Sequence, residues 1–134
     1  MTHYEIYVDG SHFPPTQQGG WAAIVRKFPE EGADVIRSGS VVDTTNNRME
    51  ILAAIKGIST TPEGADIRVF SDSQYLIMTM NIQWKRNKNW DLWKQLDDLV
   101  SLRQVKWSWI KGHAGNPLNE YADKLAKQKA QELI

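Results

Sequence analysis

Three consecutive segments with the alternating pattern of β-strands precede the first helical pattern in this chain. They are residues 4–9, 21–26 and 35–42. Gly10 with Ser11, Pro14 with Pro15, and the turn at 30–32 break them apart. Such short connections predict an antiparallel meander. Later strands come after helices, so crossover connections would make them parallel to the first strand. We therefore predict an α/β fold whose mixed five-stranded sheet has three antiparallel strands and then two parallel ones.

About four helices are expected to flank this sheet. The first begins in the polar stretch TTNNRME at 44–50, where Asn47 and Arg48 are expected to hold the turn and the helix start. Strands at 67–70 and 105–109 alternate with helical patterns at 75–80 and 90–100. Pro117 suits the first turn of the last helix, in which Tyr121, Leu125 and Ala122 are expected to face the core.

The length of 134 residues predicts one compact domain over 1–134. The chain has no cysteine, so a metal would be held by oxygen or histidine ligands. No run of about 18 apolar residues and no secretory signal is found, and we expect a cytoplasmic monomer without membrane contact. Sixteen basic residues balance sixteen acidic ones, so nucleic acid would have to bind through local patches.

Four acidic residues recur at the ends of predicted elements. Asp9 closes the first strand, Asp72 follows the fourth, Glu50 lies in the first turns of a helix, and Asp123 lies on the last helix. Open α/β sheets place their sites where the carboxyl ends of parallel strands gather. If the four carboxylates meet within about 6 Å, their six repulsions total about 17 kcal/mol at an effective dielectric of about 20. This repulsion exceeds the whole stability of a small domain, which is about 5–15 kcal/mol, so the carboxylates must spread apart, take up protons or bind cations.

Hard divalent cations such as Mg²⁺ prefer carboxylate oxygens, and two of them can activate water against a phosphodiester. The acids therefore favour a metal-dependent nuclease over a glycoside hydrolase, which needs only two carboxylates beside a sugar groove. A structural role is the alternative for Glu50, because an acid in the first turns of a helix also complements the helix dipole. His113, in a loop flanked by glycines, could transfer a proton or could simply be an exposed loop histidine.

The chain resembles type 1 ribonuclease H over nearly its full length. The segments that carry the resemblance are YVDGS at 7–11, TTNNRME at 44–50, SDSQY at 71–75 and WSWIKGHAGNPLNE at 107–120, together with Asp123. The resemblance implies the ribonuclease H fold and hydrolysis of the RNA strand of an RNA–DNA hybrid, with little sequence specificity and with 3′-hydroxyl and 5′-phosphate products. It also implies two Mg²⁺ ions, which Mn²⁺ can replace. Their ligands would be Asp9, Glu50, Asp72 and Asp123, and His113 would complete the catalytic set.

The resemblance also implies substrate contacts. Asn46 and Gln74 match positions that contact the minor groove and 2′-hydroxyls, and Thr45 matches a DNA-phosphate contact. Gly10, Ser11 and His12 border the expected site. The loop at 12–18 departs from the family because it contains two prolines and lacks an asparagine that often touches the hybrid.

A second departure is the short basic segment at 84–90, where many family members have a longer basic protrusion. Its expected substrate-binding residues are Trp84, Lys85, Arg86 and Lys88. Cations interleaved with aromatic rings suit phosphate binding and stacking, but a solvated turn between two core tryptophans is equally compatible with the composition. A non-catalytic hybrid-binding module and a related two-metal nuclease of the same fold are the alternative functions.

Overall fold

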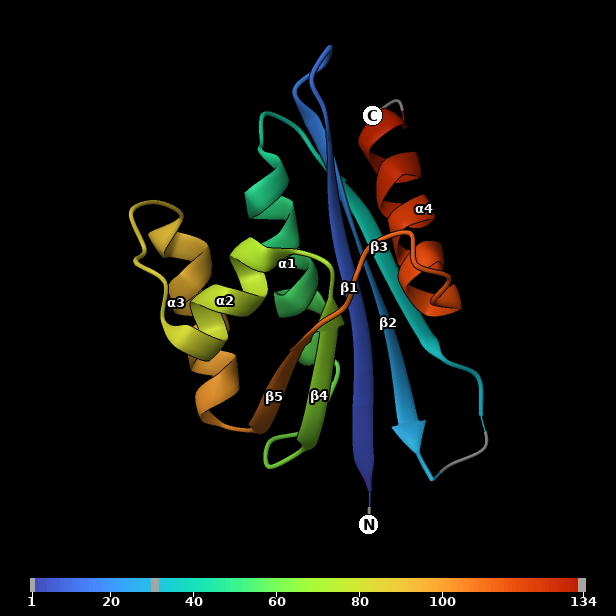
Figure 1. The fold of residues 1–134 in the computed structure, drawn as a ribbon, viewed down its shortest axis with the longest axis vertical. Coiled ribbons are helices and arrows are strands. Elements are labelled where there is room, and N and C mark those ends of the chain that lie inside the picture. Colours follow the sequence, from blue (N-terminus) through green and yellow to red (C-terminus); the bar gives the residue numbers. More distant parts are fainter. Residues whose placement is uncertain (1, 30–31, 133–134) are drawn as a thin grey trace.

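One mixed sheet organises the chain, for which the computed structural model describes residues 2–29 and 32–132. The strands lie in the order β3-β2-β1-β4-β5 (Figure 1). Strands β1 (His3–Phe13), β2 (Gln18–Phe28) and β3 (Val35–Val41) pair antiparallel, whereas β4 (Asp66–Ser71) pairs parallel with β1 and with β5 (Gln104–Trp109). The predicted fold class and strand directions are confirmed.

Helices cover both faces of the sheet. Helices α1 (Asn46–Ile58), α2 (Gln74–Ile82) and α3 (Trp90–Ser101) lie on one face, and α4 (Pro117–Gln131) lies on the other (Figure 1). Successive side chains of β2 point to opposite faces of the sheet, so this strand contributes to both hydrophobic cores. Ala23 and Val25 belong to the cluster with α1, while Ala22 and Ile24 pack against α4. No described helix has the length and apolar character needed to cross a membrane.

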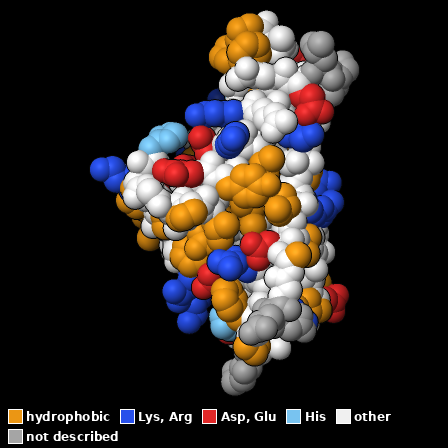
Figure 2. Space-filling model, turned by 90° about the vertical axis from the view of Figure 1, so that its right-hand side faces the viewer, with side chains coloured by type: hydrophobic (Ala, Val, Ile, Leu, Met, Phe, Trp, Pro, Cys, Tyr) orange, Lys and Arg blue, Asp and Glu red, His pale blue; other side chains and the backbone are white. Residues whose placement is uncertain are grey.

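The inward face of α4 agrees with the prediction at Ala122 and Leu125 but not at Tyr121. Tyr121 is 42% exposed, whereas Leu125 is partly buried and packs against the cluster that contains Ala122. The buried apolar positions are Ala122, Ala126 and Ala130. Their small side chains allow close packing, so close that a Cβ on Gly20 of β2 would collide with the α4 backbone at Ala126. Figure 2 views this side of the molecule, where hydrophobic side chains gather among charged ones.

Strand β1 is longer than predicted. It continues past Asp9 to Phe13 because β2 pairs with it as far as Phe13 and Gln18. The glycine and serine after Asp9 therefore remain in the ladder, and the hairpin turns at residues 14–17. Asp9 still lies just beyond the parallel pairing, whose last pair is Tyr7 with Phe70. Residues 30 and 31 of the predicted turn lie outside the described residues.

Candidate active site

Gly10 is the point at which β1 approaches the start of α1. Its buried N–H donates to Oδ1 of Asp9 at 2.9 Å and to Oε1 of Glu50 at 2.8 Å. A Cβ on Gly10 would lie 2.5 Å from backbone atoms of both Met49 and Glu50. Only a residue without a side chain permits this approach. Gly10 was predicted to border the substrate, and the structure shows its N–H occupied by the two carboxylates.

Three of the four predicted acids come together. Single oxygens of Asp9, Glu50 and Asp72 lie within 4.8 Å of one another, and within the described ranges these residues form the one such group. Asp9 and Glu50 are each 3% exposed, and Asp72 is partly buried. Oε2 of Glu50 is buried and has no hydrogen-bond partner among the described residues. Strand β1, helix α1 and the end of β4 thus contribute one carboxylate each.

Burial and mutual repulsion make these groups hold protons. Burial, followed by the charge of Asp72, raises the pKa of Asp9 from 3.8 to about 8. Burial and the charge of Asp9 raise the pKa of Glu50 well above its usual range. Burial also raises the pKa of Asp72, although Asn119 and His113 act in the opposite direction. Buried oxygens that must either bind protons or face a cation are suited to a hard divalent metal.

Asp123 and His113 lie at the margin of this group. The charge of Asp123 raises the pKa values of Asp9 and Asp72, but its own carboxylate is paired with Nζ of Lys127 at 3.1 Å. His113 is exposed in the loop between β5 and α4 and has a left-handed backbone, with φ of 56°. This loop packs on Asp72, because a Cβ on Gly112 would lie 2.8 Å from Oδ2 of Asp72.

The residues predicted to contact substrate occupy two helix starts and a hairpin. Thr45, Asn46 and Gln74 are exposed where α1 and α2 begin. Oγ1 of Thr45 caps α1 by accepting from the Arg48 N–H at 3.2 Å. Asn47, which was expected to hold the helix start, is therefore not the capping side chain. Ser11 and His12 are partly buried in β1, and Nε2 of His12 lies 3.1 Å from Oε1 of Gln17 in the hairpin loop.

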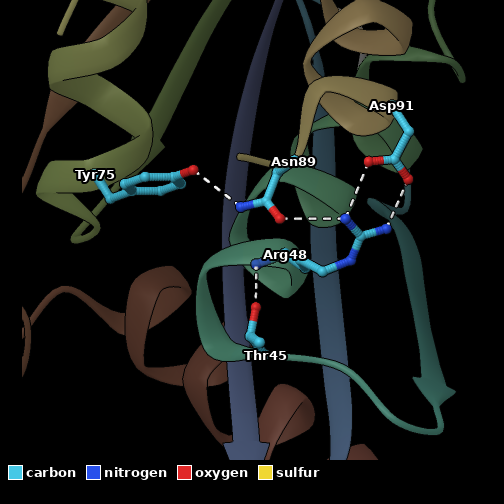
Figure 3. A network of polar contacts seen from close by, with 5 residues as sticks. All are labelled: Thr45, Arg48, Tyr75, Asn89 and Asp91. Carbon is cyan, nitrogen blue, oxygen red and sulfur yellow. Dashed lines mark hydrogen bonds and ion pairs between the residues drawn. The ribbon is translucent and has the colours of Figure 1, made fainter. Parts of the chain in front are cut away.

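A polar network unforeseen from the sequence joins the starts of three helices (Figure 3). The Arg48 guanidinium donates to both oxygens of Asp91, at 3.0 and 2.7 Å, and to Oδ1 of Asn89 at 3.2 Å. Nδ2 of Asn89 donates to the Tyr75 hydroxyl at 3.0 Å. The Arg48 hydrogen bond lowers the pKa of Asp91 to about 2.

This network holds the segment at 85–89 beside the cap of α1. A cavity of about 220 Å³ lies between them. It is lined by Thr45, Asn47, Tyr75, Lys85, Asn87, Lys88 and Asn89. The two substrate-binding segments predicted separately from the sequence therefore border one cavity.

The side chains of the basic segment at 84–90 differ in exposure and in their partners within the protein. Trp84 is 45% exposed and Trp90 is 59% exposed, so the reading of both as core tryptophans is wrong. Arg86 is paired with Asp97 on α3 and lies 4.8 Å from the centre of the Trp93 ring. Lys85 and Lys88 are exposed and make no ion pair with any described residue. Arg86 therefore ties the loop between α2 and α3 to α3, whereas the lysines face solvent.

Comparison with known proteins gives one consistent result. The model of the RNase H family matches residues 1–131. Proteins named ribonuclease H from Francisella philomiragia subsp. philomiragia and Francisella tularensis subsp. novicida are each 42% identical, over 95% and 96% of this chain and 90% and 91% of their own lengths. The solved N-terminal RNase H domain of a Mycobacterium tuberculosis protein has the same fold, with a TM-score of 0.84 at 21% identity over 97% of this chain and 94% of that one.

Proposed function

This chain belongs to the ribonuclease H family, and from that premise we propose that it is an endoribonuclease that hydrolyses the RNA strand of RNA–DNA hybrids. The observation that carries the proposal is the buried group formed by Asp9, Glu50 and Asp72, whose oxygens lie within 4.8 Å of one another. Beside this group, the exposed starts of α1 and α2 offer amide and hydroxyl groups to a nucleic acid. Cleavage would leave 3′-hydroxyl and 5′-phosphate ends.

We propose that Asp9, Glu50, Asp72 and Asp123 hold two divalent cations, Mg²⁺ or in its place Mn²⁺. The unpartnered buried Oε2 of Glu50 and the raised pKa values of the cluster suit such ions. When bound, the ions would lower the pKa of an attacking water and neutralise charge on the phosphodiester. Oδ2 of Asp123 is paired with Lys127, so Oδ1 would be the oxygen that this residue offers to an ion.

The chain's own groups orient and transfer protons around that centre. The Gly10 N–H fixes Oε1 of Glu50, which leaves Oε2 as the free oxygen of that carboxylate. The His113 imidazole, in an exposed loop beside Asp72, would accept or donate a proton during cleavage. Ser11 and His12, next in β1 after Gly10, would border the cleaved strand.

Substrate recognition is assigned to exposed residues that line the 220 Å³ cavity and to residues next to them in the sequence. Thr45, Lys85 and Lys88 line it, and Asn46, Gln74 and Trp84 are each adjacent to a lining residue. Asn46 and Gln74 would test for 2′-hydroxyls in the minor groove. Thr45, Lys85 and Lys88 would contact DNA phosphates, and Trp84 would stack on sugar or base. Contacts of this kind depend on sugar and shape, so little sequence preference is expected. Arg86, already paired with Asp97, would contribute to this surface indirectly.

A cleavage assay tests the proposal. Labelled RNA–DNA hybrid, double-stranded DNA and double-stranded RNA are incubated with and without Mg²⁺. Cleavage of the RNA strand of the hybrid alone, and only with the metal, is the expected result. Cutting of double-stranded DNA would indicate a related two-metal nuclease, and hybrid binding without cleavage would indicate a non-catalytic module. Asp9→Asn and Asp72→Asn serve as matched inactive variants, because each removes one ligand charge.

We further propose that the protein acts as a cytoplasmic monomer built from one domain. The shared sheet and the two cores that flank it support this organisation. Sedimentation analysis would give the mass of one chain, and a dimeric mass would contradict the assignment.

A further inference from the structure

Asn119, near the start of α4, is buried without an evident structural reason. It is 2% exposed, and its Nδ2 makes no hydrogen bond of good geometry with any described residue. The cap of α4 does not need this side chain. Oδ1 of Asn116 already accepts from the backbone N–H groups of Leu118 and Asn119, at 3.1 and 3.0 Å. Burying an amide without a partner costs free energy, so such a group calls for an explanation.

The position of Asn119 in the fold supplies an explanation for its burial. It lies four residues before Asp123, so the two side chains share one face of α4. The Asn119 amide is close enough to Asp72 to lower the pKa of that carboxyl group. The loop at Gly112 closes another side of the same carboxylate, because a Cβ there would lie 2.8 Å from Oδ2. Asn119 is therefore a neutral donor directed at the acidic group from the α4 side.

We propose that Asn119 is a positioning residue that orients the Asp72 carboxylate for cation binding. Donation by the amide to one oxygen of Asp72 would leave the other for the cation shared with Asp9 and Glu50. A neutral donor achieves this without adding charge, whereas a lysine at this place would compete with the cation. The inference rests on the proposed metal-dependent function and extends it to a residue outside the set of acids.

Asn119→Leu separates this role from core packing. Leucine is similar in size and fills the same space but cannot donate, so core packing in the cation-free protein should change little and the variant should stay folded. The dissociation constant for Mn²⁺, measured by calorimetry, should rise about 10- to 100-fold, as is typical when a group that orients a metal ligand is removed. The rate constant kcat should fall with little change in KM, because the substrate surface is untouched. Asn81→Leu is the control, since the Asn81 amide bonds to the Trp107 carbonyl oxygen and should not affect Mn²⁺ affinity.

Several outcomes would overturn the proposal. Wild-type Mn²⁺ affinity in Asn119→Leu, with or without loss of stability, would reduce Asn119 to a packing residue. If that variant does not fold, Asn119→Gln should bind Mn²⁺ more tightly than Asn119→Ala because it keeps the amide, and equal affinities would contradict the role. A wild-type protein that binds no divalent cation would instead overturn the metal site itself, which separates failure of the proposed function from failure of this inference.

Discussion

The backbone N–H of Gly10 on β1 donates a 2.8 Å hydrogen bond to Oε1 of Glu50 on α1. A methyl group on Gly10 would lie 2.5 Å from backbone atoms of Met49 and Glu50, which cannot move without shifting the helix. Gly10→Ala should therefore lower the free energy of unfolding by about 1–3 kcal/mol, the usual cost of overpacking, and should impair cleavage. Urea denaturation measures the first effect. Gly32→Ala, where nothing lies within 4 Å, is the control and should change stability by less than about 0.5 kcal/mol.

Glu50→Gln should raise the stability of the cation-free protein and abolish cleavage. The buried Glu50 carboxyl group has a pKa well above its usual range and an oxygen without a partner, so its charged form destabilises the cation-free protein. A neutral amide of the same shape should raise the melting temperature at pH 8 in a chelator. Hybrid binding through Thr45 and Asn46, on the exposed side of the helix start, should persist while cleavage fails. A lower melting temperature than wild type under these conditions would contradict the prediction.

The cation-free protein should become less stable as the pH rises from about 4 to about 8. The pKa of Asp9 is about 8 in the folded state and 3.8 as its ordinary value, so the folded state binds more protons across that window. Stability from this group is complete below pH 4 and lost as the pH passes 8. Melting temperatures from pH 5 to 9 in a chelator should show the fall, and Mg²⁺ should reduce it by replacing protons. Asp9→Asn should make the fall shallower without abolishing it, because the pKa values of Glu50 and Asp72 are also raised. An equally steep fall in that variant would show that Asp9 does not cause it.

Local patterns located some of these acids better than others. Asp72 follows a short apolar strand whose end was visible in the sequence, and the structure places it directly after β4. The predicted strand end at Asp9 was wrong because pairing with β2 overrides the turn preference of the glycine and serine that follow. A glycine is required at position 10 because α1 approaches β1 closely there. The contact involves Glu50, 40 positions away, so the sequence around Gly10 does not predict it.

Long-range polar partners account for most of what the sequence could not predict. Arg48 and Asp91 are 43 residues apart, and neither lies in a charge pattern that predicts the other. Arg86 was grouped with its lysine neighbours because composition cannot show that Asp97 on α3 binds it. Asn119 drew no attention because asparagine in the first turn of a helix is ordinary, and only its burial without a partner distinguishes it.

Arg48→Ala should destabilise the protein more at neutral pH than in strong acid. Arg48 holds the pKa of Asp91 at about 2, so the stability from this pair is present above the ordinary pKa of 3.8 and lost as the pH falls through about 2. The difference in melting temperature between wild type and variant should accordingly shrink from pH 6 to pH 2. Arg48→Lys should restore only part of the effect, because lysine cannot bind both oxygens of Asp91 as a fork. A difference that stays constant with pH would show that the pair does not cause it.

Neighbouring cations in the segment at 84–90 should respond differently to substitution. Lys85 and Lys88 are exposed and make no ion pair with any described residue, so changing both to alanine should raise KM for the hybrid and reduce the dependence of binding on salt, with stability unchanged. Arg86→Ala should instead cost about 1 kcal/mol of stability, because it removes the ion pair with Asp97 and the contact with the Trp93 ring. Kinetics over a salt series and urea denaturation of both variants measure the two effects. Unchanged KM in the double lysine variant would show that another surface binds the DNA strand. If Arg86→Ala instead changes the salt dependence of binding more than the lysine substitutions do, Arg86 contacts the substrate directly.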